Sequence, residues 1–284
     1  MTSLADPGIP DSDLRLIAVM PLHTITTLHG ERGLRARLAI EAERLFSVAD
    51  REKIGEAVQL AAVLHEHDSR QREPFINHLL RVALRILIHY DVADVDITCA
   101  AVLHDTVEDH AGNLSAGGRS GALEVLAARF GRRVASLVEA VTNPVYDPGS
   151  EWSKDQQYRA HVAASLAACP DARVIKVSDF TDNGVGIIHT TGPRAVRLAG
   201  KYAPLVPVLA ELVNRADTPL SPIARMRILT QLSAAGERFA ALAAMNTGSP
   251  VLGAEPDRGA DATRSPGTAA QPRPRPRRSG RQAQ

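Results

Sequence analysis

The hexapeptide at residues 104–109 concentrates more reactive side chains than any other stretch of the sequence. It reads His-Asp-Thr-Val-Glu-Asp and follows an apolar run that begins at Ile97. At helical spacing His104 lies beside Glu108, and Asp105 lies beside both Glu108 and Asp109. Three neighbouring carboxylates repel one another, so they favour a bound divalent cation. A solvated helix end is the alternative, but acids at a helix C-terminus would oppose the helix dipole.

Two further residues, His78 and Asp179, can complete a metal-binding set with His104 and Asp105. His78 lies early in an expected helix, and Asp179 ends the segment Ile175-Lys176-Val177-Ser178-Asp179. Taken alone, His78 is typical of a core or surface histidine and Asp179 of a helix cap. Together, two imidazoles and two carboxylates suit Mn(II) or Fe(II) with positions left for water better than a closed structural zinc site. Open positions indicate catalysis.

The order of these motifs resembles the HD-domain metal-dependent phosphohydrolases, and among them the hydrolase domain of the RelA/SpoT alarmone enzymes and their small stand-alone relatives. The resemblance covers roughly residues 55–215. Its segments are Glu73-Pro74-Phe75-Ile76-Asn77-His78, the HD and ED signature of residues 100–109, Phe130-Gly131 with residues 138–142, and residues 174–179 followed by Asn183.

The resemblance implies a role for each candidate site residue. His78, His104, Asp105 and Asp179 would hold one Mn(II), Glu108 and Asp109 would handle protons and water, and Asn183 would lie against the substrate. The implied reaction is hydrolysis of guanosine 3′,5′-bis(diphosphate), or its pentaphosphate form, at the 3′ position with release of pyrophosphate, as in the stringent response. Arg70 and Arg72 offer planar donors that can pair with a phosphate or stack on a purine, so we expect them to bind the substrate.

Two segments depart from the family pattern. Arg70-Gln71-Arg72 runs directly into Glu73, one residue shorter than usual and without a glycine, and Phe180-Thr181-Asp182 stands where the family has Arg, an aromatic or apolar residue and His. Two alternatives therefore stay open: a phosphatase of another nucleotide or of a nicotinamide dinucleotide phosphate, and a catalytically silent module that binds nucleotide. Retention of both Glu108 and Asp109 argues against the silent module.

The pattern of apolar residues predicts the elements that position these side chains. Between Glu31 and Ala244 apolar residues recur mostly at spacings of three and four, which predicts an all-α, multi-helix bundle. The resemblance implies that this bundle is an HD domain. The expected helices cover residues 57–67, 75–90, 97–109, 123–130, 132–141, 153–169, 195–214 and 222–244. Gly131 is expected to end one helix, and Ser153 with Gln156 forms a capping-box pattern. Residues 174–177 fit either a short strand or a helix.

The 284 residues divide into three expected parts. Residues 1–30 show little periodicity and are predicted to form a loosely ordered leader, and residues 31–246 to form the helical HD phosphohydrolase domain. Residues 247–284 are predicted to be a disordered Pro/Arg-rich tail. Because no further synthetase domain follows residue 215, we expect a hydrolase-only protein.

Charge and composition narrow the possible partners and the compartment. The tail carries seven arginines and three acids, which leaves the rest of the chain at −3. This mildly acidic body argues against specific nucleic-acid binding. The resemblance implies a small-molecule nucleotide as the substrate. The sequence has no apolar run long enough for a membrane helix and no signal peptide. Two cysteines, Cys99 and Cys169, cannot form a disulfide framework, so the expected compartment is the cytoplasm.

Overall fold

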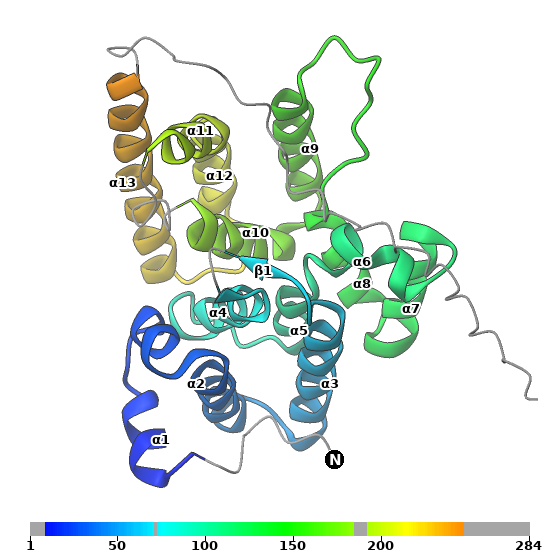
Figure 1. The fold of residues 1–284 in the computed structure, drawn as a ribbon, viewed down its shortest axis with the longest axis vertical. Coiled ribbons are helices and arrows are strands. Elements are labelled where there is room, and N and C mark those ends of the chain that lie inside the picture. The colour runs from blue at the N-terminus through cyan, green and yellow to red at the C-terminus, as the bar shows by residue number, and fades with distance from the viewer. Residues whose placement is uncertain (1–8, 71–72, 185–191, 247–284) are drawn as a thin grey trace, which may run out of the picture. The chain divides into compact units, whose positions relative to one another are not determined.

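Helices make up nearly all the secondary structure in the computed structural model, which describes residues 9–70, 73–184 and 192–246 (Figure 1). The described elements are α1 (Asp11–Ile17), α2 (Leu22–Leu45), α3 (Val48–Leu64), β1 (Ser69–Arg70), β2 (Glu73–Pro74), α4 (Ile76–Ile88), α5 (Val95–Leu103), α6 (Thr106–Leu114), α7 (Gly118–Phe130), α8 (Arg132–Val141), α9 (Lys154–Ala168), α10 (Pro170–Asn183), α11 (Pro193–Tyr202), α12 (Leu205–Asn214) and α13 (Pro222–Asn246). The two strands form a small antiparallel hairpin with Ser69 opposite Pro74. The prediction of an all-α bundle is therefore confirmed.

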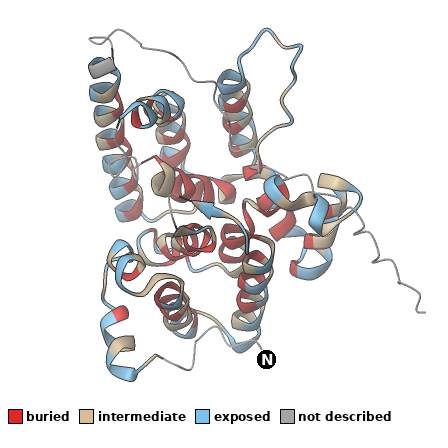
Figure 2. Ribbon diagram, in the orientation of Figure 1, coloured by how far each residue is buried: buried red, intermediate tan, exposed pale blue. Residues whose placement is uncertain are grey.

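Helices α4, α5 and α10 lie at the centre of the bundle. Helix α4 packs against α2, α5 and α10, while α5 packs against α3 and α8. Nearly every side chain of α4 and α5 is buried, as the red ribbon segments of Figure 2 show. A helix that is apolar on most of its circumference is stable only when other helices surround it. The polar residues at the ends of these central helices are consequently held by a rigid, close-packed core.

Several local signals in the sequence are confirmed. Gly131 has φ 93°, a conformation that favours glycine, and it separates α7 from α8. The Ser153 side chain accepts a hydrogen bond from the backbone amide of Gln156, and the Gln156 side chain accepts one from the backbone amide of Ser153. Together these two bonds form a complete capping box. The ambiguous residues 174–177 lie inside α10, so the helical alternative holds.

The expected loosely ordered leader is wrong for residues 11–30. They form α1 and the first part of α2, and Ile17 and Ile25 are fully buried. Arg37, from the second half of α2, donates to the carbonyl oxygens of Ile17 (2.8 Å) and Met20 (3.3 Å). Gly30, at φ 56°, bends α2 between the two halves. Short helices with few periodic apolar residues are difficult to predict from the sequence. Here tertiary contacts stabilise these helices.

Two long helices expected from the sequence are each divided in the structure. Residues 97–109 belong to α5 and α6, which meet at His104 and Asp105, and residues 195–214 belong to α11 and α12, which meet near Pro204. Proline has no amide hydrogen and its ring clashes with the preceding turn, which accounts for the second division. The first division changes the electrostatics of the site, because Glu108 and Asp109 now lie in the first turn of α6. The dipole of α6 stabilises acidic side chains at its N-terminus. The expectation that these acids lie at a helix C-terminus and oppose its dipole was therefore wrong.

The predicted tail, residues 247–284, lies outside the described residues. None of the described helices has the length and hydrophobicity of a membrane span.

Candidate metal centre

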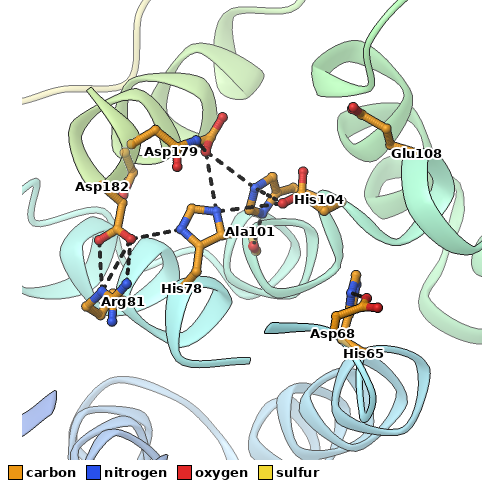
Figure 3. Close-up of polar contacts among 12 residues, drawn as sticks. His65, Asp68, His78, Arg81, Ala101, His104, Glu108, Asp179 and Asp182 are labelled. Carbon is orange, nitrogen blue, oxygen red and sulfur yellow. Dashed lines mark hydrogen bonds and ion pairs between the residues drawn. The ribbon is translucent and has the colours of Figure 1, made fainter. Parts of the chain in front are cut away.

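Three separate parts of the fold bring the four predicted metal ligands together. His78 lies in the first turn of α4, His104 and Asp105 lie at the junction of α5 and α6, and Asp179 lies on α10. Figure 3 shows the His78 ring between Asp182 on one side and Asp179 with His104 on the other. The contact of α10 with both α4 and α5 therefore closes the cluster.

Short distances separate the potential ligand atoms. His104 Nε2 lies 3.1 Å from Asp105 Oδ2 and 3.7 Å from Asp179 Oδ1. His78 Nε2 lies 3.6 Å from Asp105 Oδ2 and 3.4 Å from Asp179 Oδ1. Atoms that bind one ion at about 2.0 to 2.2 Å are separated by roughly 3 to 4 Å, so these spacings fit a common ion. The ligand atoms of His78, His104 and Asp179 all lie within 4.8 Å of one another, and Asp105 lies beside both histidines.

Hydrogen bonds to the far side of each imidazole orient Nε2 toward the cluster. His104 Nδ1 lies 2.8 Å from the carbonyl oxygen of Ala101, and His78 Nδ1 lies 2.8 Å from Asp182 Oδ2. Since a carbonyl and a carboxylate can only accept, both Nδ1 atoms carry the hydrogen. In a neutral ring this leaves the Nε2 lone pair for a metal. His104 Nε2 is buried and makes no hydrogen bond of good geometry within the described part of the chain.

Asp182 is a buried carboxylate that the analysis of the sequence did not identify as part of the site. Besides His78 it accepts from Arg81 (Nη2 to Oδ2, 2.9 Å) and from Arg85 (Nη2 to Oδ1, 2.9 Å). Arg81 also pairs with Glu73, at 2.7 Å. Although burial opposes ionisation, the hydrogen bonds from His78 and Arg81 hold the pKa of Asp182 well below its usual range. Asp182 is therefore charged when it orients His78, which is the usual outer partner of a metal-binding histidine.

Helical spacing could have revealed this part of the site. Asp179 and Asp182 are three residues apart on α10, which places both carboxylates on one face, and Arg81 follows His78 at the same interval on α4. The signal was hidden because residues 174–177 fitted a strand as well as a helix. In a strand, positions three apart point to opposite faces.

Asp179 makes two further contacts with its own helix. Lys176 Nζ lies 3.2 Å from Asp179 Oδ2, and Asn183 Nδ2 donates to Asp179 Oδ1 at 2.5 Å. Both Lys176 and Asp179 are buried. Burial opposes ionisation, yet the charge of Lys176 and the nearby imidazoles of His104 and His78 hold the pKa of Asp179 well below its usual range. Asn183, expected at the substrate, instead orients a metal ligand, and its substrate role stays a prediction.

Glu108 and Asp109 lie in the first turn of α6, near Asp105, and both residues are exposed. Asn143 donates to Glu108 through its side chain (2.5 Å) and its backbone amide (3.2 Å). Partial desolvation and the charge of Asp105 raise the pKa of Glu108. Partial desolvation, with Asp105 and Glu108 next, raises the pKa of Asp109 to about 7. A divalent cation in the cluster would offset Asp105 and lower both pKa values.

The donor set fits a divalent metal ion. Without an ion, the charges of Asp105 and Asp179 outweigh burial and raise the pKa of His104 well above its usual value, so a proton occupies the space between them. A cation can replace that proton and contact both nitrogens and both carboxylates at once. Two nitrogens and two carboxylate oxygens also leave coordination positions for water or substrate.

The predicted substrate-binding arginines cannot be placed against this centre. Arg72 lies outside the described residues, and the structure describes only the backbone of Arg70, in β1. Their role stays a prediction.

Comparison with known proteins identifies relatives over the same region. The profile of the HD-domain family matches residues 57–181. A guanosine-3′,5′-bis(diphosphate) 3′-pyrophosphohydrolase of Aquifex aeolicus is 37% identical over 135 residues, which are 46% of this chain and 17% of that protein. The guanosine-3′,5′-bis(diphosphate) 3′-pyrophosphohydrolase MESH1 of Xenopus tropicalis is 33% identical over 135 residues, which are 46% of this chain and 67% of that protein.

A solved structure of a metazoan orthologue of SpoT, whose title says that it hydrolyses ppGpp, superposes with a TM-score of 0.49 at 24% identity. The alignment covers 66% of this chain and 94% of that one. The region that the HD-domain profile matches contains all four predicted metal ligands, Glu108 and Asp109. The Xenopus tropicalis match, at 33% identity over 67% of that protein, shows that the chain belongs to the HD-domain family that contains MESH1.

Proposed function

We propose that this protein hydrolyses guanosine 3′,5′-bis(diphosphate), and its pentaphosphate form, at the 3′ position with release of pyrophosphate. The observation that carries the proposal is the convergence of His78, His104, Asp105 and Asp179, with Glu108 and Asp109 beside them. The names of the relatives support the substrate.

We assign the metal to Mn(II), held by the four converging residues. When bound, a divalent ion supplies Lewis acidity, which makes water a stronger nucleophile and offsets negative charge on a phosphoryl group. His78 and His104 present neutral Nε2 atoms to it because Asp182 and the Ala101 carbonyl hold their Nδ1 hydrogens. The mixed nitrogen and oxygen donors support Mn(II) over a closed zinc site.

The chain's own carboxylates handle the protons of the reaction. Water attacks the phosphorus attached to the 3′ oxygen and loses a proton, and the 3′ oxygen leaves and takes up a proton to become a hydroxyl. Glu108 and Asp109 lie near Asp105, where one can orient the water and accept its proton. Asn143 fixes the orientation of Glu108 through two hydrogen bonds.

The second candidate function is hydrolysis of another phosphorylated nucleotide, such as a nicotinamide dinucleotide phosphate. Phe180 favours this second candidate function, because the family has an arginine at this position. The Phe180 ring is instead buried against Tyr202 (5.7 Å between ring centroids) and Phe239 (6.3 Å). Phe180 brings no positive charge to a phosphate group, so recognition of the substrate differs from the family pattern at this residue.

A substrate panel separates these candidates. The full-length protein with Mn(II) is incubated with guanosine 3′,5′-bis(diphosphate), its adenosine counterpart and a nicotinamide dinucleotide phosphate, and released pyrophosphate and phosphate are measured separately. We expect pyrophosphate from the guanosine compound. Phosphate from the dinucleotide alone would establish the second candidate, and no release from any substrate would indicate a silent module.

Variants test the assigned roles. Glu108→Gln and Asp109→Asn should keep the metal and lower turnover by roughly 100-fold for whichever carboxylate accepts the proton. His104→Ala should lose both metal and activity. Glu124→Gln, on an exposed position of α7, is the matched control and should change neither. Loss of metal in Glu108→Gln or Asp109→Asn would show that the residue is a ligand.

A further inference from the structure

A second cluster of potential ligand atoms lies outside the four-residue metal centre. His65, the residue after α3, lies with its Nδ1 2.7 Å from Asp68 Oδ2, and His110 Nε2, from α6, lies 2.6 Å from the same oxygen. The two nitrogens are 3.2 Å apart. Figure 3 shows His65 and Asp68 together beside the end of α3. None of the three residues belongs to the centre described above.

Hydrogen bonds alone do not explain the close approach of these three atoms. For both imidazoles to donate to one carboxylate oxygen, two N–H hydrogens must point at the same small region and crowd each other. A single cation satisfies all three atoms instead, because both nitrogens then present lone pairs. Ligand atoms about 2.1 Å from a tetrahedral ion are about 3.4 Å apart. The two nitrogens are already near that separation, and each would move about 0.7 to 0.8 Å away from the Asp68 oxygen to admit an ion.

The surroundings of the cluster hold the ligands in place and favour a cation. His65 is 2% exposed, and its ring stacks on Phe75 at 4.6 Å between centroids with 9° between the planes. Asp105 of the first centre adds a second negative charge near His65, besides that of Asp68 in the cluster itself.

We propose that His65, Asp68 and His110 form a second divalent-metal site, with water completing the coordination. Two imidazoles and one carboxylate suit a borderline ion such as Zn²⁺. The ion would join the end of α3, the residue before β1 and α6, and so fasten the β1–β2 hairpin to the helix that carries Glu108 and Asp109. Phe75 lies between the two centres, since its ring also contacts the ring of His78, at 5.7 Å between centroids.

Counting bound ions tests this site without reference to activity. The full-length protein is stripped with a chelator and titrated with Zn²⁺, and bound metal is measured by mass spectrometry after gel filtration. We expect two ions per chain for the wild type, one for His110→Ala, one for Asp68→Asn and one for His104→Ala. The double variant His104→Ala/His110→Ala should bind none.

The chain provides a matched control in His67, an exposed histidine between the two ligands of the α3 end. His67→Ala should keep two ions. Repeating the titration with Co²⁺ should show loss of one of two visible absorption components in Asp68→Asn, with unchanged helix content by circular dichroism. One ion in the wild type, two ions in both His110→Ala and Asp68→Asn, or one ion in His67→Ala would overturn the proposal. The count is independent of the proposed hydrolysis, so either can fail alone.

Discussion

Replacing Asp182 with asparagine should weaken metal binding although Asp182 does not face the ion. Arg81 Nε and Arg85 Nη2 both donate to Oδ1, so the new amide oxygen takes that position. The amide nitrogen then takes the position of Oδ2, where it faces His78 and loses the hydrogen bond from Arg81 Nη2. His78 Nδ1 then has to accept, which moves its hydrogen to Nε2, the atom that faces the metal centre. The substitution thus converts a metal ligand into the wrong tautomer.

The expected loss follows from this change of tautomer. Outer partners of metal-binding histidines contribute roughly 10- to 100-fold to affinity, equivalent to about 1.4 to 2.7 kcal/mol. Removing one member of a buried ion pair also costs about 3 kcal/mol of stability, near the lower limit for such pairs because Glu73 still compensates Arg81. The metal-free protein should therefore unfold at lower urea concentration as well.

Competition with a fluorescent chelator for Mn(II) measures the affinity, and nitrogen NMR of the metal-free protein identifies which nitrogen of His78 carries the hydrogen. Glu73→Gln is the matched control, since it removes the other carboxylate on Arg81 without touching His78, and its metal affinity should match the wild type. Wild-type affinity in Asp182→Asn, or an equal loss in Glu73→Gln, would refute the reasoning.

Three further predictions concern stability. Ile25→Ala should lower the free energy of unfolding by about 2 to 5 kcal/mol in urea titrations because Ile25 is fully buried, whereas a loosely ordered leader would give no change. Burial alone would raise the pKa of Asp94, but hydrogen bonds from Arg133 and the Ile97 amide lower it below the value in the unfolded chain. The charged form of Asp94 therefore stabilises the fold above about pH 4. This contribution is lost as the pH falls through the pKa of Asp94 in the folded state. The difference in unfolding free energy between the wild type and Asp94→Asn should accordingly be largest near pH 7 and shrink below pH 4, and a constant difference would contradict the assignment. A chain ending at Met245 should melt at the same temperature as the full chain in calorimetry, because the residues that follow have no apolar periodicity, and a large fall in melting temperature would show that they join the core.

Local sequence determined the features that depend on nearby residues. Gly131 ends α7 because a left-handed conformation favours glycine, and Ser153 with Gln156 starts α9 through contacts three residues apart. The predicted metal ligands could be chosen from the sequence for a related reason. His104 and Asp105 are adjacent, and the side chains of His78 and Asp179 have the right chemistry wherever the fold places them.

Tertiary structure decided what depends on partners distant in sequence. Residues 11–30 fold as helices because Arg37 and the core stabilise them, and neither contribution is visible in their own periodicity. The junction of α5 and α6 turned Glu108 and Asp109 from the end of one helix into the start of another, which reverses the sign of the helix-dipole contribution. Asp182 became part of the site only because α10 packs on α4, about a hundred residues earlier in the chain. Spacing within one element is encoded locally, whereas the pairing of elements depends on the free energy of burying them together.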